Sequence, residues 1–282
     1  MTTSHSSTLG KVYLVGAGPG AADLITVRGA RLLAQADIVF HDALVDPEML
    51  ALCPQAIQVP VGKRCGKLSS AQHFINKRLI DAAHQYQTIV RLKGGDPMMF
   101  GRADEEIQAL KDRQIDVEVV PGITAALAGA ASLGQSLTLR GISRSVAFVT
   151  VAQGQDQTTS LATSSPLAQP NADTLVYYMG RKDAANIAQQ LIAGTAHHNA
   201  ATPVHILEAV STKNERHWSS TLGELADGQA SAWFNTASPA LIMIGEALRQ
   251  KTETSDPLQS SASELDDGLQ NSLIFTDSRR SA

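Results

Sequence analysis

The stretch from Arg91 to Glu106, RLKGGDPMMFGRADEE, combines glycine, charge and apolar side chains within sixteen positions. Gly94 and Gly95 permit positive φ and let a ligand approach the backbone closely. Asp96 precedes a proline, which favours an extended backbone at the aspartate. The acidic residues at the end of the stretch suit the positive end of a helix dipole. A plain strand-to-helix turn explains this pattern as well as a ligand site does, so the residues alone leave both interpretations open.

Asp42 is a second candidate for chemistry. It follows Asp37–His41, DIVFH, which predicts a short strand. Ligands of open α/β sheets bind beyond the carboxyl ends of the strands. A carboxylate there could accept a proton, or it could hold the ribose hydroxyl of a nicotinamide nucleotide. We interpret His41 as structural because no second metal ligand lies at helical spacing from it, and we expect no metal site.

A glycine-rich loop, Gly16–Gly20 (GAGPG), lies between a predicted strand, Lys11–Val15, and a predicted helix, Ala22–Ala36. This order begins an α/β unit. The loop is not the dinucleotide fingerprint, because G-x-G-x-x-G would need glycine where Ala21 stands and would not place a proline inside the loop. Taken alone, the loop is a weak signal for any particular ligand.

The elements that must position these residues alternate along the chain, which predicts an α/β fold. Further strands are expected over Ile57–Val61, Thr88–Leu92, Asp116–Val120, Val146–Val151, Thr174–Tyr178, Pro203–Glu208 and Ser238–Gly245, and further helices over Ser69–Gln85, from Asp104, over Ile123–Ala131 and from Asp183 to Ala193. The polar segment Gln153–Ala172 is expected to be a long loop and a candidate lid.

Composition limits the possible functions. The chain has 282 residues, 43% of them hydrophobic, and a formal net charge of −4, so we expect real cores and no nucleic-acid partner. Cys53 and Cys65 match no metal spacing and indicate a reducing compartment. The sequence contains no secretory h-region and no apolar run long enough to span a membrane, so a cytoplasmic protein without a membrane partner is expected. Residues 1–10 and the polar tail 251–282 are expected to be disordered.

The sequence of Arg91–Glu106 closely resembles the signature of uroporphyrinogen-III C-methyltransferases, which belong to the tetrapyrrole methylase family. It departs from that signature at Met98-Met99 and at Ala103-Asp104, where aromatic or β-branched residues and a glycine pair are usual. The resemblance covers about residues 10–248. Other matching segments are GAGPG followed by Leu24-Ile25-Thr26, then Val61-Gly62-Lys63-Arg64, Pro121–Thr124 (PGIT), Tyr178-Met179-Gly180 and Ser238–Gly245.

This resemblance implies a fold of two α/β domains of the class III methyltransferase type, with the active site in the cleft between them. The implied domains are an N-terminal α/β domain at 11–121 and a C-terminal α/β domain at 122–250. The implied reaction methylates uroporphyrinogen III at carbons 2 and 7 to give precorrin-2, with S-adenosylmethionine as donor and no metal. It belongs to sirohaem or cobalamin biosynthesis, and a homodimer is implied as well.

The resemblance also assigns roles to residues. It implies catalytic roles for Asp42 as proton acceptor, Lys63 as proton donor, Arg102 and Glu105. It implies substrate contacts for Met98, Arg102 and Arg140. The implied cofactor-binding residues are Pro19, Gly94, Gly95, Asp96, Met99, Thr124, Ala125, Met179, Val210 and Ala240. The segment Ser136–Arg140 lacks a histidine that is common in the family, so a role assigned to that histidine does not transfer.

Other functions stay open at this point. One is a tetrapyrrole methyltransferase that acts on a later precorrin. Another is an NAD-dependent oxidoreductase, suggested by the first glycine loop and Asp42. A third is a non-enzymatic regulator that binds a nucleotide-like ligand. The sequence shows no additional N-terminal region of the kind found in fused sirohaem synthases, so a single activity is expected.

Overall fold

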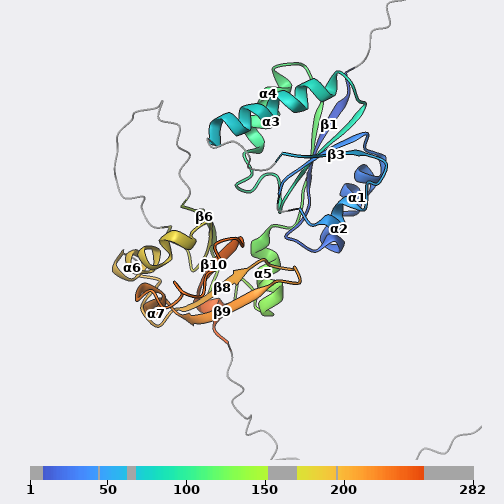
Figure 1. The fold of residues 1–282 in the computed structure, drawn as a ribbon. Helices are drawn as coiled ribbons and strands as arrows, with labels where there is room; N and C mark the ends of the chain where they lie inside the picture. Colours follow the sequence, from blue (N-terminus) through green and yellow to red (C-terminus); the bar gives the residue numbers. More distant parts are fainter. Residues whose placement is uncertain (1–8, 44, 62–67, 152–169, 195, 251–282) are drawn as a thin grey trace, which may run out of the picture. The chain divides into compact units, whose positions relative to one another are not determined.

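The computed structural model describes residues 9–43, 45–61, 68–151, 170–194 and 196–250. The described residues up to Arg249 belong to one compact unit. Within this unit the chain builds two five-stranded sheets, one from each half (Figure 1). This arrangement confirms the α/β class with a parallel sheet and a second sheet. The chain passes from one sheet to the other between Val120 and Ala125, and the domain boundary at 121/122 stays a prediction.

The first sheet is entirely parallel, with strand order β3-β2-β4-β1-β5. Its strands are β1 (Lys11–Gly16), β2 (Ile38–His41), β3 (Ile57–Pro60), β4 (Thr88–Lys93) and β5 (Val117–Val120). Helices α3 (Leu68–Ala83) and α4 (Ala103–Lys111) lie on one side of this sheet, and α1 (Val27–Gln35) and α2 (Pro47–Leu50) lie on the other (Figure 1). Because parallel strands all end at the same edge, the loops after β1, β2, β4 and β5 gather there.

The central strand β4 sends alternate side chains to the two helical layers. Ile89 packs in the core cluster that contains α3 and α4 residues, whereas Val90 and Leu92 pack in the cluster that contains α1 and α2 residues. Side chains of a strand alternate between faces with a period of two. Arg91 and Lys93 therefore share the face of Ile89, under α3 and α4, and both are buried.

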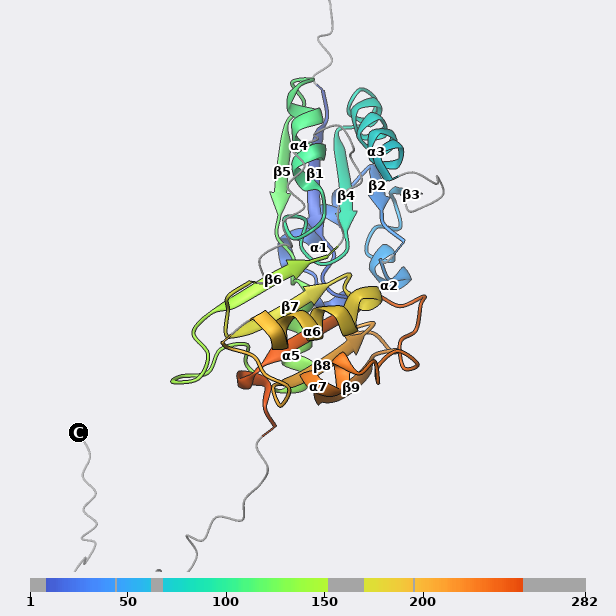
Figure 2. The same cartoon turned by 90° about the vertical axis from the view of Figure 1, so that its left-hand side faces the viewer.

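The second sheet is mixed, with strand order β6-β7-β10-β8-β9. Its strands are β6 (Val146–Thr150), β7 (Thr174–Tyr178), β8 (Pro203–Glu208), β9 (Arg216–Thr221) and β10 (Ala240–Gly245). β6 and β7 are parallel, whereas β10 runs antiparallel to both β7 and β8. Helices α6 (Ala184–Gly194) and α7 (Leu222–Ala226) contribute to one core cluster, α5 (Ala125–Leu133) to the other, and Figure 2 shows α6 in front of the strands.

The structure corrects one predicted helix. The segment Ala22–Ala36 is a 3-10 turn, η1 (Ala22–Leu24), followed by two extended residues and then α1. Thr26 causes the late start, because its side chain accepts a hydrogen bond from Gly29 N and so caps α1. Two short elements, α2 and β9, were not predicted, and neither was α7. The start of α7 carries a capping box, Thr221 with Glu224, which could have been recognised.

Several predictions concern residues outside the described ranges. These are residues 1–8 and 251–282 of the termini expected to be disordered, most of the candidate lid Gln153–Ala172, and the second cysteine, Cys65. The expected disorder of residues 1–10 is wrong for Gly10, which is buried and whose N donates to Ala83 O at 2.8 Å. Cys53 is free and buried. None of the helices in the described ranges is long and apolar enough to cross a membrane.

Candidate active site

Three glycine-containing loops interlock at the carboxyl edge of the first sheet. Gly18 and Gly95 form an isolated bridge, with N···O distances of 3.1 and 2.7 Å. Gly122, after β5, lies so close that an added Cβ would sit 2.3 Å from Gly95 O and 2.8 Å from Gly16 Cα. Only glycine allows backbones to cross at this separation. The loops that follow β1, β4 and β5 are therefore fixed relative to one another.

Asp96 holds the β4 loop in shape. Its Oδ1 accepts from Met98 N at 2.8 Å, and its Oδ2 accepts from Gly122 N at 2.8 Å. Gly95 next to it has φ +70, a conformation that the sequence analysis noted both glycines permit, and a Cβ there would meet nothing within 4 Å. Gly94 is exposed. The loop therefore presents open backbone, and its shape is held by the hydrogen bonds to the Asp96 carboxylate.

Backbone strain gathers at these loops and at the matching edge of the second sheet. Left-handed backbone costs a non-glycine residue energy and commonly marks a functional site. In the described part of the chain, the non-glycine residues with positive φ are Phe100, Arg102, Met179, Ala209 and Ser211, together with Gln114 in the turn before β5. Phe100 and Arg102 follow β4, Met179 follows β7, and the other two follow β8.

Tyr178 connects the two halves of the site. Its hydroxyl lies 2.6 Å from Thr124 Oγ1 and accepts from Ala126 N at 3.1 Å, and its ring meets that of Phe100 edge-on at 5.1 Å between centroids. Burial raises the pKa of the Tyr178 hydroxyl, which therefore stays protonated at neutral pH. Met179 follows directly and is 54% exposed. The predicted cofactor residues Thr124, Ala125 and Met179 thus lie around one tyrosine.

The predicted residues Val210 and Ala240 lie on neighbouring turns. Ala209 N donates to Pro239 O at 3.0 Å, which places the turn after β8 against the start of β10. Ser211 Oγ accepts from Ala21 N at 3.1 Å. A Cβ on Gly20, directly after Pro19, would lie 2.8 Å from Val210 O. The structure therefore brings the loop of Pro19 and the turn of Val210 together.

The residues predicted to bind substrate differ in their surroundings. Met98 and Arg102 line one small cavity of about 200 Å³. Arg102 Nε and Nη2 bind Glu105 Oε1 and Oε2 at 2.6 and 2.7 Å, a bidentate pair in an exposed position. Arg140 is exposed in the turn that the Leu139–Ser143 bridge closes, and its role stays a prediction. Lys63 lies outside the described ranges.

Asp42 does not stand alone at the end of β2. Its Oδ1 accepts from Arg91 Nη2 at 2.6 Å, while its side chain stays 33% exposed. Arg91 Nε donates to Glu106 Oε1 at 3.3 Å, and Lys93 Nζ donates to the same oxygen at 3.0 Å. We refer to Asp42, Arg91, Lys93 and Glu106 as the buried charge cluster. This cluster was not predicted from the sequence, where Glu106 was interpreted only as a charge suited to a helix start. Arg91 and Lys93, which alternate with apolar residues in the strand, could have indicated it.

Burial and the neighbouring charges both act on the ionised Lys93 of the buried charge cluster. The pKa of Lys93 is lowered, first by burial and then by the neighbouring Arg91 cation, while Glu106 acts in the opposite direction. Gln72 Nε2 also donates to Glu106 Oε1, at 3.1 Å. The other oxygen, Oε2, is buried and has no hydrogen-bond partner among the described residues. Three donors on one buried oxygen fix the carboxylate of Glu106 in place.

No group of three or more metal-ligating side chains occurs within the described ranges. The arrangement instead offers open backbone at Gly94 and Gly95, an exposed methionine, and a partly exposed carboxylate at Asp42. Such a set can hold a polar, partly apolar small molecule and accept a proton beside it.

The chain matches the family model described as "Tetrapyrrole (Corrin/Porphyrin) Methylases" over residues 11–226. It is 45% identical over 257 residues to a uroporphyrinogen-III C-methyltransferase of Pseudomonas aeruginosa, covering 90% of this chain and 99% of that relative. It is 43% identical to a siroheme synthase of Ectopseudomonas mendocina, covering 85% of this chain but 51% of the relative. The chain therefore spans about half the length of that synthase.

The chain also matches solved structures of methyltransferases. A uroporphyrin-III C-methyltransferase of Thermus thermophilus in complex with S-adenosyl homocysteine matches with a TM-score of 0.70 and 37% identity, covering 85% of this chain and 94% of that one. A cobalt precorrin-4 methyltransferase matches with a TM-score of 0.68 and 28% identity, covering 85% and 96%.

Proposed function

Because the chain belongs to the tetrapyrrole (corrin/porphyrin) methylase family, we propose that it methylates uroporphyrinogen III at carbons 2 and 7, with S-adenosylmethionine as donor, to give precorrin-2. The observation that carries this proposal is the similarity to the Pseudomonas aeruginosa enzyme, which extends over nearly the whole of both chains. The resemblance noted in the sequence is thereby confirmed at the level of the family.

The interlocked loops fit a methyl donor of this kind. S-adenosylmethionine would supply a methyl group on a positively charged sulfur. The open backbone at Gly94 and Gly95 suits the polar parts of such a molecule, and the exposed Met179 suits its apolar parts. Gly122 leaves the cradle free of side-chain atoms, because a Cβ there would collide with the β4 loop. Pro19, Asp96, Met99, Thr124, Ala125, Val210 and Ala240 complete the proposed binding residues.

The pyrrole carbons of the substrate are electron-rich and act as nucleophiles themselves. The chain therefore needs no nucleophilic serine or cysteine. Its tasks are to hold the two reactants in line, which can lower the barrier by several kcal/mol, and to accept the proton that the methylated carbon loses. Asp42 is the proposed base, because it is the partly exposed carboxylate at the end of a central strand. Lys63 and Glu105 are the proposed secondary participants in proton transfer.

Uroporphyrinogen III carries eight carboxylates, and arginine binds carboxylates through its fork of donors. Arg102 and Arg140 are the proposed anchors, with Met98 as an apolar contact. Arg102 now pairs with Glu105 in an exposed position, where an ion pair is weak. A substrate carboxylate can therefore replace Glu105 at little cost. An acidic chain does not oppose this, because only the site needs to attract anions.

We further propose that the protein is a cytoplasmic homodimer, on the basis of the family resemblance. The similarity to a cobalt precorrin-4 methyltransferase keeps a later corrin precursor as the alternative substrate, and its lower identity makes that the second choice.

Titration calorimetry tests the proposal at the level of the donor. S-adenosylhomocysteine should bind at one site per chain, and NAD should give no heat beyond dilution. A Gly122→Ala variant should lose the binding heat, whereas Gly194→Ala, whose added Cβ meets nothing within 4 Å, should keep it. Tight NAD binding without a response to S-adenosylhomocysteine would contradict a methyltransferase and support the oxidoreductase.

A further inference from the structure

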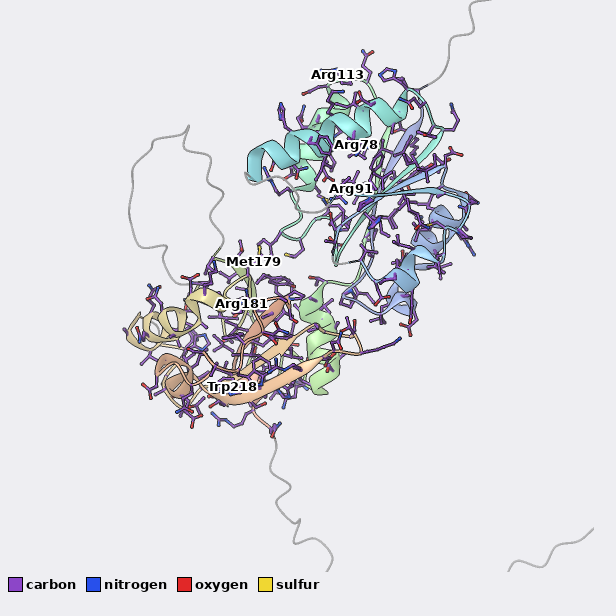
Figure 3. The ribbon with its side chains drawn as sticks, in the orientation of Figure 1. Arg78, Arg91, Arg113, Met179, Arg181 and Trp218 are labelled. Carbon is purple, nitrogen blue, oxygen red and sulfur yellow. The ribbon has the colours of Figure 1, made fainter. Side chains whose placement is uncertain are left out.

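Arg91 is an unusual residue for the middle of a sheet. It lies on β4, flanked by β1 and β2, and its side chain is 3% exposed (Figure 3). The register sets it beside Phe40 of β2, two positions before Asp42. Both Phe40 and Arg91 face the α3 and α4 layer, so Asp42 follows on the same face by alternation. A charged residue is costly there unless it is fully paired.

The guanidinium of Arg91 is held in three directions. Nη2 binds Asp42 Oδ1 at 2.6 Å, Nε binds Glu106 Oε1 at 3.3 Å, and Nη1 donates to Leu92 O at 3.1 Å. A planar guanidinium with three anchored nitrogens has little freedom to rotate. The position of Asp42 Oδ1 is therefore tied to β4 and, through Glu106, to α4.

The four charges of the cluster balance, with two cations and two carboxylates. The side chains of Arg91, Lys93 and Glu106 are 3%, 4% and 0% exposed, whereas that of Asp42 is 33% exposed. The cluster thus presents one carboxylate to the outside and buries the rest. Its shortest contact, at 2.6 Å, is the one to that carboxylate.

We propose that Arg91, held by Glu106, is a positioning residue that fixes the carboxylate of Asp42 for proton transfer. This inference rests on the proposed function, in which Asp42 accepts the proton from the methylated ring carbon. Arg91 occupies one oxygen and fixes the carboxylate plane, and the second oxygen takes the proton. Arg91 itself exchanges no proton and does not touch the substrate.

The proposal predicts that a positive charge at position 91 cannot position Asp42 without the geometry of the guanidinium. Lysine at position 91 keeps the positive charge but has a single nitrogen, which cannot bind Asp42 and Glu106 in the geometry of the guanidinium. Arg91→Lys should lower the saturated rate by roughly a hundredfold, the order expected when a reacting group is displaced by about 1 Å. The KM for S-adenosylmethionine should stay within about twofold of wild type, because the side chain of Arg91 is buried and the proposed donor contacts are with the backbone of Gly94 and Gly95.

A double-mutant cycle with Asp42→Asn separates positioning from general support of the fold. If Arg91 acts through Asp42, then Arg91→Lys should cost less than about twofold in the Asp42→Asn background, where nothing remains to be positioned. If Arg91→Lys folds poorly, Glu106→Gln, which keeps the shape of the side chain, can be combined with Asp42→Asn in a second, independent double-mutant cycle. Arg78→Lys, on the exposed face of α3, is the matched control and should leave the rate unchanged.

The outcomes distinguish the two claims. Equal rate losses in the wild-type and Asp42→Asn backgrounds would show that Arg91 supports the fold only, and would overturn the inference while leaving the methyltransferase proposal intact. A full rate for Asp42→Asn alone would overturn the inference together with the role of Asp42. Wild-type protein without methyl transfer would overturn the proposed function, and the inference with it.

Discussion

Asp42 combines a structural contact with an accessible carboxylate, since one of its oxygens binds the buried Arg91 and its side chain remains one-third exposed. Asp42→Asn keeps the shape and removes the basic carboxylate. We expect the saturated rate to fall by roughly a hundredfold or more, as for a lost general base, with both ligands still bound. Steady-state kinetics of the variant, with calorimetry for the cofactor, check this expectation.

Other roles of Asp42 predict other results for the same variant. If the carboxylate held a ribose, cofactor affinity would fall and turnover would recover at saturation. If it only completed the charge cluster, the melting temperature would fall and the rate per folded molecule would not change. An unchanged saturated rate would remove Asp42 from the catalytic residues.

At the scale of single residues, the sequence drew attention to residues of the loops more readily than to the buried side chains behind them. Met179 stands in the short segment Tyr178-Met179-Gly180 and Gly95 in the long signature Arg91–Glu106, and the structure gives both a positive φ in exposed or partly exposed turns. Arg91 and Glu106 stand in the same signature but were not selected. Their importance depends on pairing across β2, β4 and α4, which no local pattern specifies. The individual site assignments remain predictions.

At the scale of elements, the crossing of the three loops depends on Gly122. Gly122→Ala places a methyl group 2.3 Å from Gly95 O, so the β4 and β5 loops must separate. We expect a loss of about 1–3 kcal/mol in the free energy of unfolding, as for overpacked sites. Chemical denaturation measures this loss, with Gly194→Ala as a control that should change stability little. Equal stability of the two variants would show that the loops are not locked together.

The start of the second sheet carries a pH-dependent contact. Asp173 accepts hydrogen bonds from Ser145 Oγ, Arg144 N and Ser145 N, which lower its pKa to about 2, the hydroxyl contributing most. Because the folded pKa lies below the ordinary value near 4, the ionised group stabilises the fold above that pH. This stabilisation disappears as the pH falls from about 4 to about 2.

Asp173→Asn should therefore be less stable than wild type at neutral pH, and the difference should shrink as the pH falls through that window. Melting temperatures measured between pH 7 and pH 3 check this, with Asp183→Asn as the matched control on an exposed aspartate. A difference that stays constant over the range would mean that the ionisation of Asp173 does not contribute to stability.

The elements were predictable where burial on both sides of a parallel sheet produces an apolar run, as in β1 and β4. They were not predictable where tertiary contacts decide. β9 reads RHWSST, an edge strand with Trp218 as its one large apolar residue, and it exists because it pairs with β8 along its whole length. The helix expected over Ala22–Ala36 starts late because a single hydroxyl, that of Thr26, caps it.

At the scale of the whole molecule, the compact unit ends at Arg249. Its last turn is held by His205 Nε2, 2.8 Å from Leu248 O, and by Arg249, which binds Glu246. The remaining residues are polar and rich in serine and aspartate, with little apolar surface to bury. A chain ending at Arg249 should therefore keep its melting temperature and turnover. A melting temperature several degrees lower would show that residues 250–282 stabilise the compact unit.

The proposed reaction is tested most directly by its product. Purified protein is incubated anaerobically with uroporphyrinogen III and S-adenosylmethionine that carries an isotopically labelled methyl group, and the tetrapyrroles are analysed by mass spectrometry over time. We predict two labelled methyl groups per product, arriving through a monomethylated intermediate, and no transfer in the absence of the protein. Unmodified uroporphyrinogen III, under conditions in which S-adenosylhomocysteine is shown to bind, would contradict the account and direct attention to a later corrin precursor.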